Sequence, residues 1–218
     1  MADGKISQAA DHRDELFTLL SDIETYLLKY KNLFTGKTII CNCDDPFESS
    51  FFKFFLHNFN VSALKKLITV SRADSPLSGK ELPVFEMVNR QKIKKAYKIE
   101  VVETASLQDD YIAILGTAGT LLASDKNQFT LLKGDGDFRS NECIELLKEA
   151  DIAVTFPPHS IFQEYVKLLM QYEKKFLLIG SKDEINSPVV SAWIKEKQMR
   201  IDSSFKNSET VCFTNLEI

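Results

Sequence analysis

Residues 142–181 read ECIELLKEADIAVTFPPHSIFQEYVKLLMQYEKKFLLIGS, and this stretch decides the fold class. Apolar residues recur at helical spacing in some segments and form short β-rich runs in others. The expected order is helix over 142–150, strand over 151–156, helix over 160–172, strand over 174–181 and helix over 187–197. Parallel strands need crossover connections, which helices supply. We therefore predict an α/β protein with a doubly wound, mostly parallel sheet and helices on both faces.

The N-terminal half shows the same alternation. Residues 14–33, DELFTLLSDIETYLLKYKNL, carry apolar side chains at helical spacing and predict an amphipathic helix. Further elements are expected in KTIICNC (strand, 37–43), SSFFKFFLHNFN (helix capped by Ser49 or Ser50, 49–60), LKKLITVSR (strand, 64–72) and AYKIEVVET (strand, 96–104). Residues 109–125 fit either a hairpin or an insertion. We expect a helical segment over residues 1–35 that packs on an α/β domain over residues 36–218.

The composition is that of a folded globular protein without a basic surplus. Of the 218 residues, 44% are hydrophobic and 27% are charged, which is close to the average for soluble domains. The formal net charge of −4 repels a polyanion, so contact with DNA would have to come from a local basic patch. The densest candidate, NRQKIKK over residues 89–95, is more typical of a solvated helix face.

Cysteine usage and hydropathy predict a cytoplasmic protein without a metal site. The cysteines form no Cys-x-x-Cys pair, and the three histidines lie at no ligand spacing from them. The N-terminus is polar and carries no secretory signal. No apolar run approaches the roughly 20 residues that span a bilayer, so no membrane partner is expected.

Three segments rich in polar residues or proline lie at the ends of expected elements: two follow expected strands, and one precedes the helix expected over 142–150. They are NCDDP over residues 42–46, GDGDFRS over 134–140 and TFPPHS over 155–160. In open α/β sheets, ligands bind in the crevice at the carboxyl ends of the strands. We expect these three segments to line one pocket.

A strand that ends in a polar residue followed by Pro-Pro and an aromatic is the signature of amino-methyltransferases that act on nucleic acids. The segment TFPPHS, together with CNCDDP over 41–46 and GDGDFRS, resembles the EcoRI-type adenine-N6 DNA methyltransferase family. The matching blocks keep the family order from about residue 14 to the terminal CFTNLE. The resemblance implies the class I S-adenosylmethionine-dependent methyltransferase fold, a Rossmann-like sheet.

The resemblance also implies S-adenosylmethionine as cofactor. At the first strand end, Asp44, Asp45 and Pro46 would face its methionine and ribose parts. In the loop, Asp137 and Phe138 would flank its adenine. On the N-terminal helix, Phe17 and Thr18 would cap the cofactor. A carboxylate suits ammonium and hydroxyl groups because it is a hydrogen-bond acceptor. The alternatives are a simple turn at the first strand end and a Gly-Asp turn in the loop.

The catalytic tetrapeptide Phe156, Pro157, Pro158 and His159 departs from the family pattern Asn-Pro-Pro-Phe. In the family, the Asn oxygen and a backbone carbonyl accept the hydrogens of a flipped adenine amine, and the aromatic stacks on the base. Phe156 has no acceptor, and His159 replaces the stacking ring while adding a titratable group. A catalytic role for His159 is the less expected alternative to a structural one.

These departures predict a degenerate homologue that binds S-adenosylmethionine, is catalytically impaired and acts as a binding or inhibitory protein, as a phage or mobile-element product would. The alternative is an active adenine-specific enzyme with a non-standard motif. A gene product in decay is less consistent with the uninterrupted apolar patterning. Much of the family's C-terminal part is expected to be absent. DNA binding is therefore expected to be weak, and a protein partner cannot be named.

Overall fold

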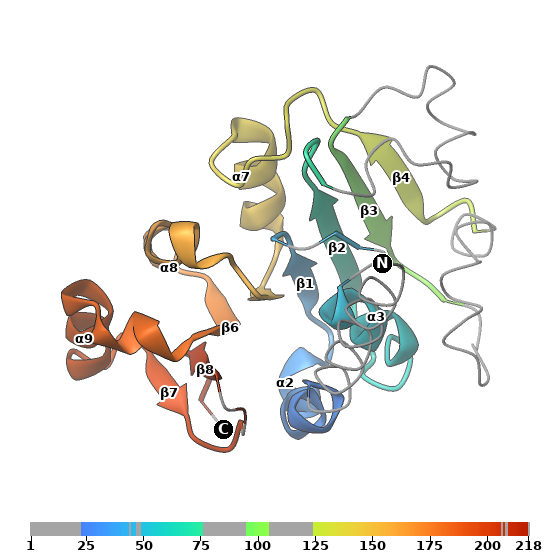
Figure 1. Cartoon of the computed structure of the whole chain (residues 1–218). Helices are drawn as coiled ribbons and strands as arrows, with labels where there is room; N and C mark the ends of the chain where they lie inside the picture. The colour runs from blue at the N-terminus through green and yellow to red at the C-terminus, as the bar shows by residue number, and fades with distance from the viewer. Residues whose placement is uncertain are drawn as a thin grey trace, which may run out of the picture.

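The computed structural model describes residues 23–43, 45–46, 49–75, 95–104, 124–205, 207 and 209–217. Its centre is one eight-stranded sheet with the order β4-β3-β2-β1-β5-β6-β8-β7 (Figure 1). The strands are β1 (Thr38–Cys41), β2 (Lys66–Ser71), β3 (Tyr97–Val101), β4 (Gln128–Leu131), β5 (Ile152–Thr155), β6 (Lys175–Ser181), β7 (Arg200–Asp202) and β8 (Thr210–Thr214). All five strands expected from the sequence form, and they are β1, β2, β3, β5 and β6. The strands β4, β7 and β8 were not expected.

The sheet is mixed, with a parallel centre and antiparallel flanks. The pairs β1–β2, β1–β5 and β5–β6 are parallel. The pairs β2–β3, β3–β4, β6–β8 and β7–β8 are antiparallel. The α/β class is confirmed, but the prediction of a mostly parallel sheet is wrong. The reason is that β3 and β8 run back along the outer strands of the parallel centre, and β4 and β7 pair with them.

Helices form in the described part of each segment for which the apolar spacing predicts one, and a short 3-10 helix over residues 182–186 was not expected. They are η1 (Leu28–Tyr30), α2 (Lys31–Phe34), α3 (Ser50–His57), α7 (Asn141–Glu149), η2 (His159–Ile161), α8 (Phe162–Gln171), η3 (Lys182–Asn186) and α9 (Pro188–Lys195), and residues 23–27 are also helical. The Ser49 hydroxyl oxygen accepts a hydrogen bond from the Phe52 N–H at 3.3 Å and caps α3. Ser140 caps α7 in the same way. These caps fix the points where the loops around the sheet's carboxyl edge turn into helix.

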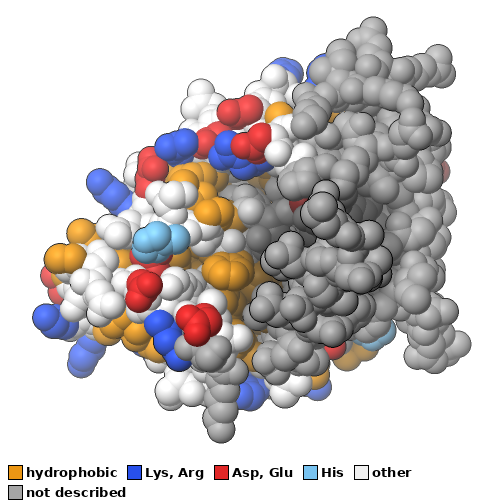
Figure 2. Space-filling view, in the orientation of Figure 1, with side chains coloured by type: hydrophobic (Ala, Val, Ile, Leu, Met, Phe, Trp, Pro, Cys, Tyr) orange, Lys and Arg blue, Asp and Glu red, His pale blue; other side chains and the backbone are white. Residues whose placement is uncertain are grey.

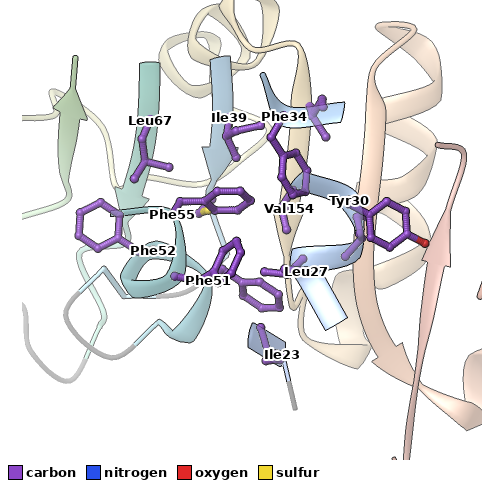
Figure 3. Packing of buried hydrophobic residues seen from close by; sticks show 14 of the residues in the cluster. Ile23, Leu27, Tyr30, Phe34, Ile39, Phe51, Phe52, Phe55, Leu67 and Val154 are labelled. Atoms are coloured by element: carbon purple, nitrogen blue, oxygen red, sulfur yellow. The ribbon is translucent and has the colours of Figure 1, made fainter. Parts of the chain in front are cut away.

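Side chains of β1 alternate between two hydrophobic layers. Ile39 and Cys41 pack on one face with the N-terminal helical segment and α3. Ile40 packs on the other face with α7, α8 and α9. Figure 3 shows the first layer, in which side chains from the N-terminal helical segment, α3, β1, β2 and β5 gather in one cluster. The expected helices on both faces are therefore confirmed, and burial of this kind is the main force that holds the parallel centre together.

A buried polar cluster ties the N-terminal helical segment to the C-terminal hairpin. The Tyr26 hydroxyl donates to Asp202 Oδ2 at 2.7 Å, and the Tyr30 hydroxyl donates to the same oxygen. The Ser204 N–H donates to Asp202 Oδ1 at 2.8 Å. Asp202 is 6% exposed, so these three donors replace the water that the carboxylate loses. The two ends of the described chain are thus joined at one point.

Candidate functional site

A pocket of about 740 Å³ opens at the carboxyl ends of β1, β2 and β5. The chain passes from β1 to β2 on one side and returns to β5 on the other side of β1, so this is where the strand order reverses. Ligands of open α/β sheets bind at such a point. The volume lies within the roughly 300–1,000 Å³ typical of small-molecule sites. Its lining comes from all three segments expected there, as Asn42, Cys43, Asp45, Gly136, Phe138, Phe156, Pro158 and Ser160.

The Asp45 carboxylate at the first strand end is occupied by hydroxyl donors. Its Oδ2 accepts hydrogen bonds from Ser71 at 2.8 Å and from Ser75, and the Tyr97 hydroxyl lies 3.2 Å from the same oxygen. Asp45 lines the pocket, but these bonds fasten it to β2 and β3. Pro46 is buried and lies outside the pocket lining.

Asn42 at the end of β1 also lines the pocket and is 5% exposed. Its Oδ1 accepts a hydrogen bond from the hydroxyl of Tyr165 on α8. Tyr165 in turn packs edge-on against Phe138, with ring centroids 5.3 Å apart. The sequence placed the segment of residues 42–46 in this pocket but assigned no individual role to Asn42, although it is a polar residue directly after a buried strand.

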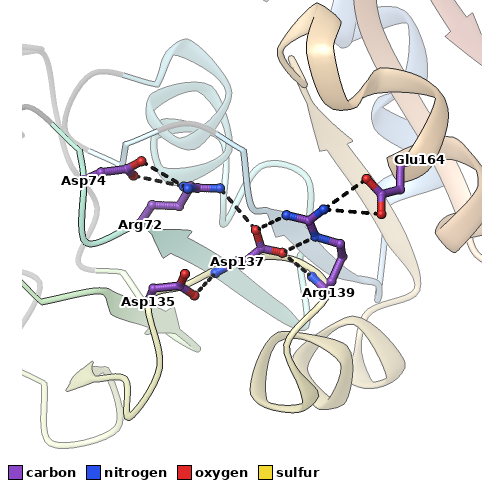
Figure 4. A network of polar contacts seen from close by, with 6 residues as sticks. All are labelled: Arg72, Asp74, Asp135, Asp137, Arg139 and Glu164. Carbon is purple, nitrogen blue, oxygen red and sulfur yellow. Dashed lines mark hydrogen bonds and ion pairs between the residues drawn. The ribbon is translucent and has the colours of Figure 1, made fainter.

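The loop of residues 134–140 is held by an ion-pair network (Figure 4). Asp137 accepts from Arg139 through both carboxylate oxygens, at 2.7 and 2.6 Å, and from Arg72 at 3.3 Å. Arg72 also pairs with Asp74, and Arg139 also pairs with Glu164. Phe138 is buried and forms an apolar wall of the pocket, whereas Asp137 lies outside the lining. The network therefore joins the loop to the end of β2 and to α8.

Acid should weaken this network. The pKa of Asp137 is lowered to about 2, chiefly by the hydrogen bonds from Arg139, against burial, which raises it. Because the folded pKa is below the unfolded value of about 3.9, Asp137 stabilises the fold above about pH 4 and loses that contribution between about pH 4 and pH 2. In urea unfolding, the difference in stability between the unmodified chain and Asp137→Asn should shrink over this range. A difference that stays constant from pH 7 to pH 2 would contradict the assignment.

Gly136 brings the loop backbone close to β2. Its φ of +79° is in the left-handed region, and a Cβ there would lie 2.8 Å from the Ser71 carbonyl oxygen and 2.9 Å from Ala96 Cβ. Gly136→Ala is expected to lower the free energy of unfolding by about 2–4 kcal/mol through backbone strain and overpacking. Gly134→Ala is the matched control, since the nearest atom to its Cβ would be 3.9 Å away. Equal melting curves for the two variants would refute this explanation.

The tetrapeptide is divided between the pocket and the surface. Phe156 follows β5, lines the pocket and packs against the first hydrophobic layer, and Pro158 also lines the pocket. Pro157 is buried. His159 lies outside the lining, and its Nδ1 is 2.5 Å from Glu184 Oε1. The His159 side chain is 70% exposed, whereas that of Glu184 is 1% exposed.

Several expected site residues lie outside the described residues. These are Phe17, Thr18, Asp44 and most of the basic stretch 89–95. Ile23, which belongs to the same predicted helix as Phe17, is described and lines the pocket. The N-terminal helical segment therefore reaches the site.

The comparisons with known proteins identify the family. The sequence matches the family described as adenine-specific methyltransferase EcoRI over residues 5–215. The chain belongs to this family. It is 38% identical to Type II methyltransferase M.EcoRI of Escherichia coli over 186 residues, which are 85% of this chain and 51% of that protein. No solved structure matches.

Two further proteins that are similar to this chain come from mycoplasmas. A Type II methyltransferase of Mycoplasma genitalium is 35% identical, and M.MpnI of Mycoplasma pneumoniae is 31% identical. Each match covers 85% of this chain and 46% of the relative. The chain therefore spans about half the length of the curated relatives that it matches. The family resemblance expected from the sequence is confirmed.

The described residues contain neither a candidate metal centre nor a candidate membrane span. Among the described residues, no three His, Cys, Asp or Glu side chains are grouped to hold a metal ion. No helix in the same part of the chain has the length and apolarity to cross a bilayer. On the face in Figure 2, the described Lys and Arg side chains are scattered among Asp and Glu.

Proposed function

We propose that this member of the EcoRI methyltransferase family binds S-adenosylmethionine in the pocket at the carboxyl ends of β1, β2 and β5. The observation that carries the proposal is the convergence of the three family segments on one cavity at the point where the strand order reverses. We also infer that the parallel centre is a Rossmann-like, doubly wound unit of the class I type. The helical segment of residues 1–35 would pack on this domain of residues 36–218.

The residues of the pocket fit the cofactor. The charged residues of the lining are Asp45, Asp74 and Arg72, which together carry one net negative charge. The cofactor carries one net positive charge, so the two charges are complementary. Phe138 and Ile161 offer apolar walls of the kind that hold a purine. We further propose that Asp44, Phe17 and Thr18 complete the site.

Bound S-adenosylmethionine supplies an electrophilic methyl group, and the acceptor in this family is the adenine N6 amine. The amine is a weak nucleophile, because its lone pair is delocalised into the ring. A hydrogen-bond acceptor at the strand end would orient it and withdraw its protons. The position of that acceptor is held by Phe156, which presents only an aromatic ring. We therefore propose that methyl transfer is impaired and that the chain acts as a binding or inhibitory protein.

The setting proposed for this activity is the cytoplasm of a cell with a restriction-modification system. DNA is the proposed macromolecular partner because the relatives are Type II methyltransferases. We propose weak rather than tight binding, since the net charge is −4. A phage or mobile-element origin would suit an inhibitory protein.

One observation favours the alternative of an active enzyme with a non-standard motif. The buried Glu184 carboxylate holds Nδ1 of the exposed His159 imidazole at 2.5 Å. A carboxylate that receives Nδ1–H leaves Nε2 as a proton acceptor, as in other carboxylate–histidine pairs. Such a ring beside the pocket mouth could take the proton that the methylated amine releases. Methyl transfer by the unmodified chain that is lost in Glu184→Gln would support this alternative over the impaired enzyme.

Calorimetric titration tests the cofactor proposal. S-adenosylhomocysteine, the demethylated product, should bind the unmodified chain in a one-to-one complex. Cys43→Phe inserts a ring into the pocket and should abolish binding, whereas Gln198→Phe, at a surface depression away from the site, should not. The absence of any heat of binding at ligand concentrations up to about 1 mM would reject the proposal, because a dissociation constant of about 1 mM corresponds to a binding free energy of only about −4 kcal/mol.

A further inference from the structure

A buried carboxylate and an exposed histidine meet at the carboxyl edge of the sheet. Glu184 lies in η3, directly after β6, and His159 begins η2, shortly after β5. The strands β5 and β6 are parallel neighbours, so both segments leave the sheet at the edge where the pocket opens. Pro158 and Ser160, on either side of His159 in the chain, line the pocket. The imidazole therefore lies at the rim of the pocket.

The hydrogen bonding of Glu184 differs from that of Asp202, the other buried carboxylate with a histidine or tyrosine partner. Asp202 receives hydrogen bonds from three donors. Among the described residues, Oε2 of Glu184 has no hydrogen-bond partner, and Oε1 lies 2.5 Å from His159 Nδ1. A carboxylate that is buried only to stabilise a fold gathers several donors, because unpaired buried oxygens cost free energy. The burial of Glu184 is therefore better explained by its effect on His159.

The pair makes one edge of the imidazole a proton acceptor. A carboxylate only accepts hydrogen bonds, so Nδ1 carries the proton and Nε2 of the neutral ring does not. The His159 side chain is 70% exposed, so the ring edge away from Glu184 is open to a bound molecule. A base beside a methyl-transfer site favours an acceptor that loses its proton as it reacts. A hydroxyl group is such an acceptor, whereas an adenine amine attacks through its lone pair and loses its proton afterwards.

The pocket wall next to His159 favours a small aromatic acceptor without charge. Phe156 and Pro158 line the pocket and present apolar surface against which an aromatic ring can pack. The one cation of the described lining, Arg72, is already paired with Asp74 and Asp137. An acceptor that carries phosphate groups would therefore meet no unpaired cation in the described lining. A neutral phenol meets both conditions, an aromatic ring and a hydroxyl proton.

We propose that this chain methylates the hydroxyl oxygen of a small phenol, with His159 as the catalytic base and Glu184 as a positioning residue. The phenol oxygen bonds to the methyl carbon while the bond from that carbon to the sulfonium sulfur breaks, and the bonding pair stays on sulfur. The phenol proton passes to His159 Nε2 and then to water. The products are an aryl methyl ether and S-adenosylhomocysteine. This inference rests on the proposed cofactor site and gives it an acceptor other than DNA adenine.

The absorbance of 4-nitrophenol provides a readout that needs no turnover, since its ionised form absorbs visible light strongly. At about pH 6, where the unbound phenol is mostly protonated, the chain with S-adenosylhomocysteine should raise this absorbance because His159 takes the proton. His159→Gln should abolish the rise, and Glu184→Gln should reduce it. His57→Gln is the matched control, because it makes the same change at an exposed histidine outside the described pocket lining.

Methyl transfer from S-adenosylmethionine provides the second readout. The unmodified chain should methylate phenol, and His159→Gln should lower that rate by roughly 10²–10⁴-fold, the usual contribution of a general base. The loss should be much smaller for 4-nitrophenol at about pH 8, because this acceptor is then ionised without a base. Glu184→Gln should show the same dependence on the acceptor with a smaller loss. His159→Gln should bind S-adenosylhomocysteine within about twofold of the unmodified chain, which controls for folding.

Two results would overturn the inference and leave the proposed cofactor site intact. One is a chain that binds S-adenosylhomocysteine but neither methylates a phenol nor raises the absorbance of 4-nitrophenol. The other is an equal loss for the two phenols in His159→Gln, which would give His159 a structural role only. If the unmodified chain does not bind S-adenosylhomocysteine, the proposed function fails and the inference fails with it.

Discussion

Phe156→Asn combined with His159→Phe is expected to raise methyl transfer to DNA adenine by at least roughly 10²-fold over the unmodified chain. The Asn side chain would place an amide oxygen at the carboxyl end of β5, where Phe156 now lines the pocket. A single preorganised hydrogen-bonding group in an active site is typically worth about 10²–10³ in rate. The measurement is incorporation of a labelled methyl group from S-adenosylmethionine into mixed-sequence DNA.

Phe156→Leu with His159→Phe is the matched control for this gain. It opens space at the same position and restores the same stacking ring, but it adds no acceptor. We expect it to stay as inactive as the unmodified chain. Robust transfer by the unmodified chain would overturn the proposed impairment, and loss of that transfer in Glu184→Gln would then support the His159–Glu184 alternative.

The second large effect is on stability. Asp202→Ala should lower the free energy of unfolding by about 3–5 kcal/mol, because it removes the acceptor of a backbone N–H and of two buried phenol hydroxyls, which then have only one another as partner at 3.0 Å. The carboxylate is ionised in the fold: burial raises its pKa, but hydrogen bonds from Tyr30, Ser204 and Tyr26 outweigh burial and lower it to about 2. Urea unfolding of the variant beside the unmodified chain measures the loss.

Tyr30→Phe separates the hydrogen bond from the packing. It keeps the buried ring and removes one donor, so a loss of about 1–2 kcal/mol is expected. Because Ile23 of the same helical segment lines the pocket, Asp202→Ala should also weaken cofactor binding. A change below about 1 kcal/mol in Asp202→Ala would show that the cluster does not anchor this segment.

The sequence predicted the elements of the core better than their directions. Apolar spacing identified α3, α7, α8 and α9, and β-rich runs identified β1, β2, β5 and β6, because burial of these elements leaves a periodic pattern. This pattern does not show in which direction a strand runs relative to its neighbours. Tyr97–Val101 could therefore be predicted as a strand, but its antiparallel pairing with β2 could not. β7 was missed because it is only three residues long.

At the site, the sequence predicted which loops meet but not how their side chains are paired. The strand-end rule brought Asn42, Gly136 and Phe156 to one pocket. It could not show that the Asp45 carboxylate is taken by Ser71, Ser75 and Tyr97, since these donors are 26 to 52 residues away along the chain. Pairing between distant segments depends on the sheet register, which no local motif encodes.

The position of the bound cofactor is tested most directly by a crystal structure of the complex with S-adenosylhomocysteine. The predicted result is a ligand in the pocket at the carboxyl ends of β1 and β5, with its purine against Phe138. A ligand bound elsewhere on the chain, with this pocket empty, would contradict the central claim.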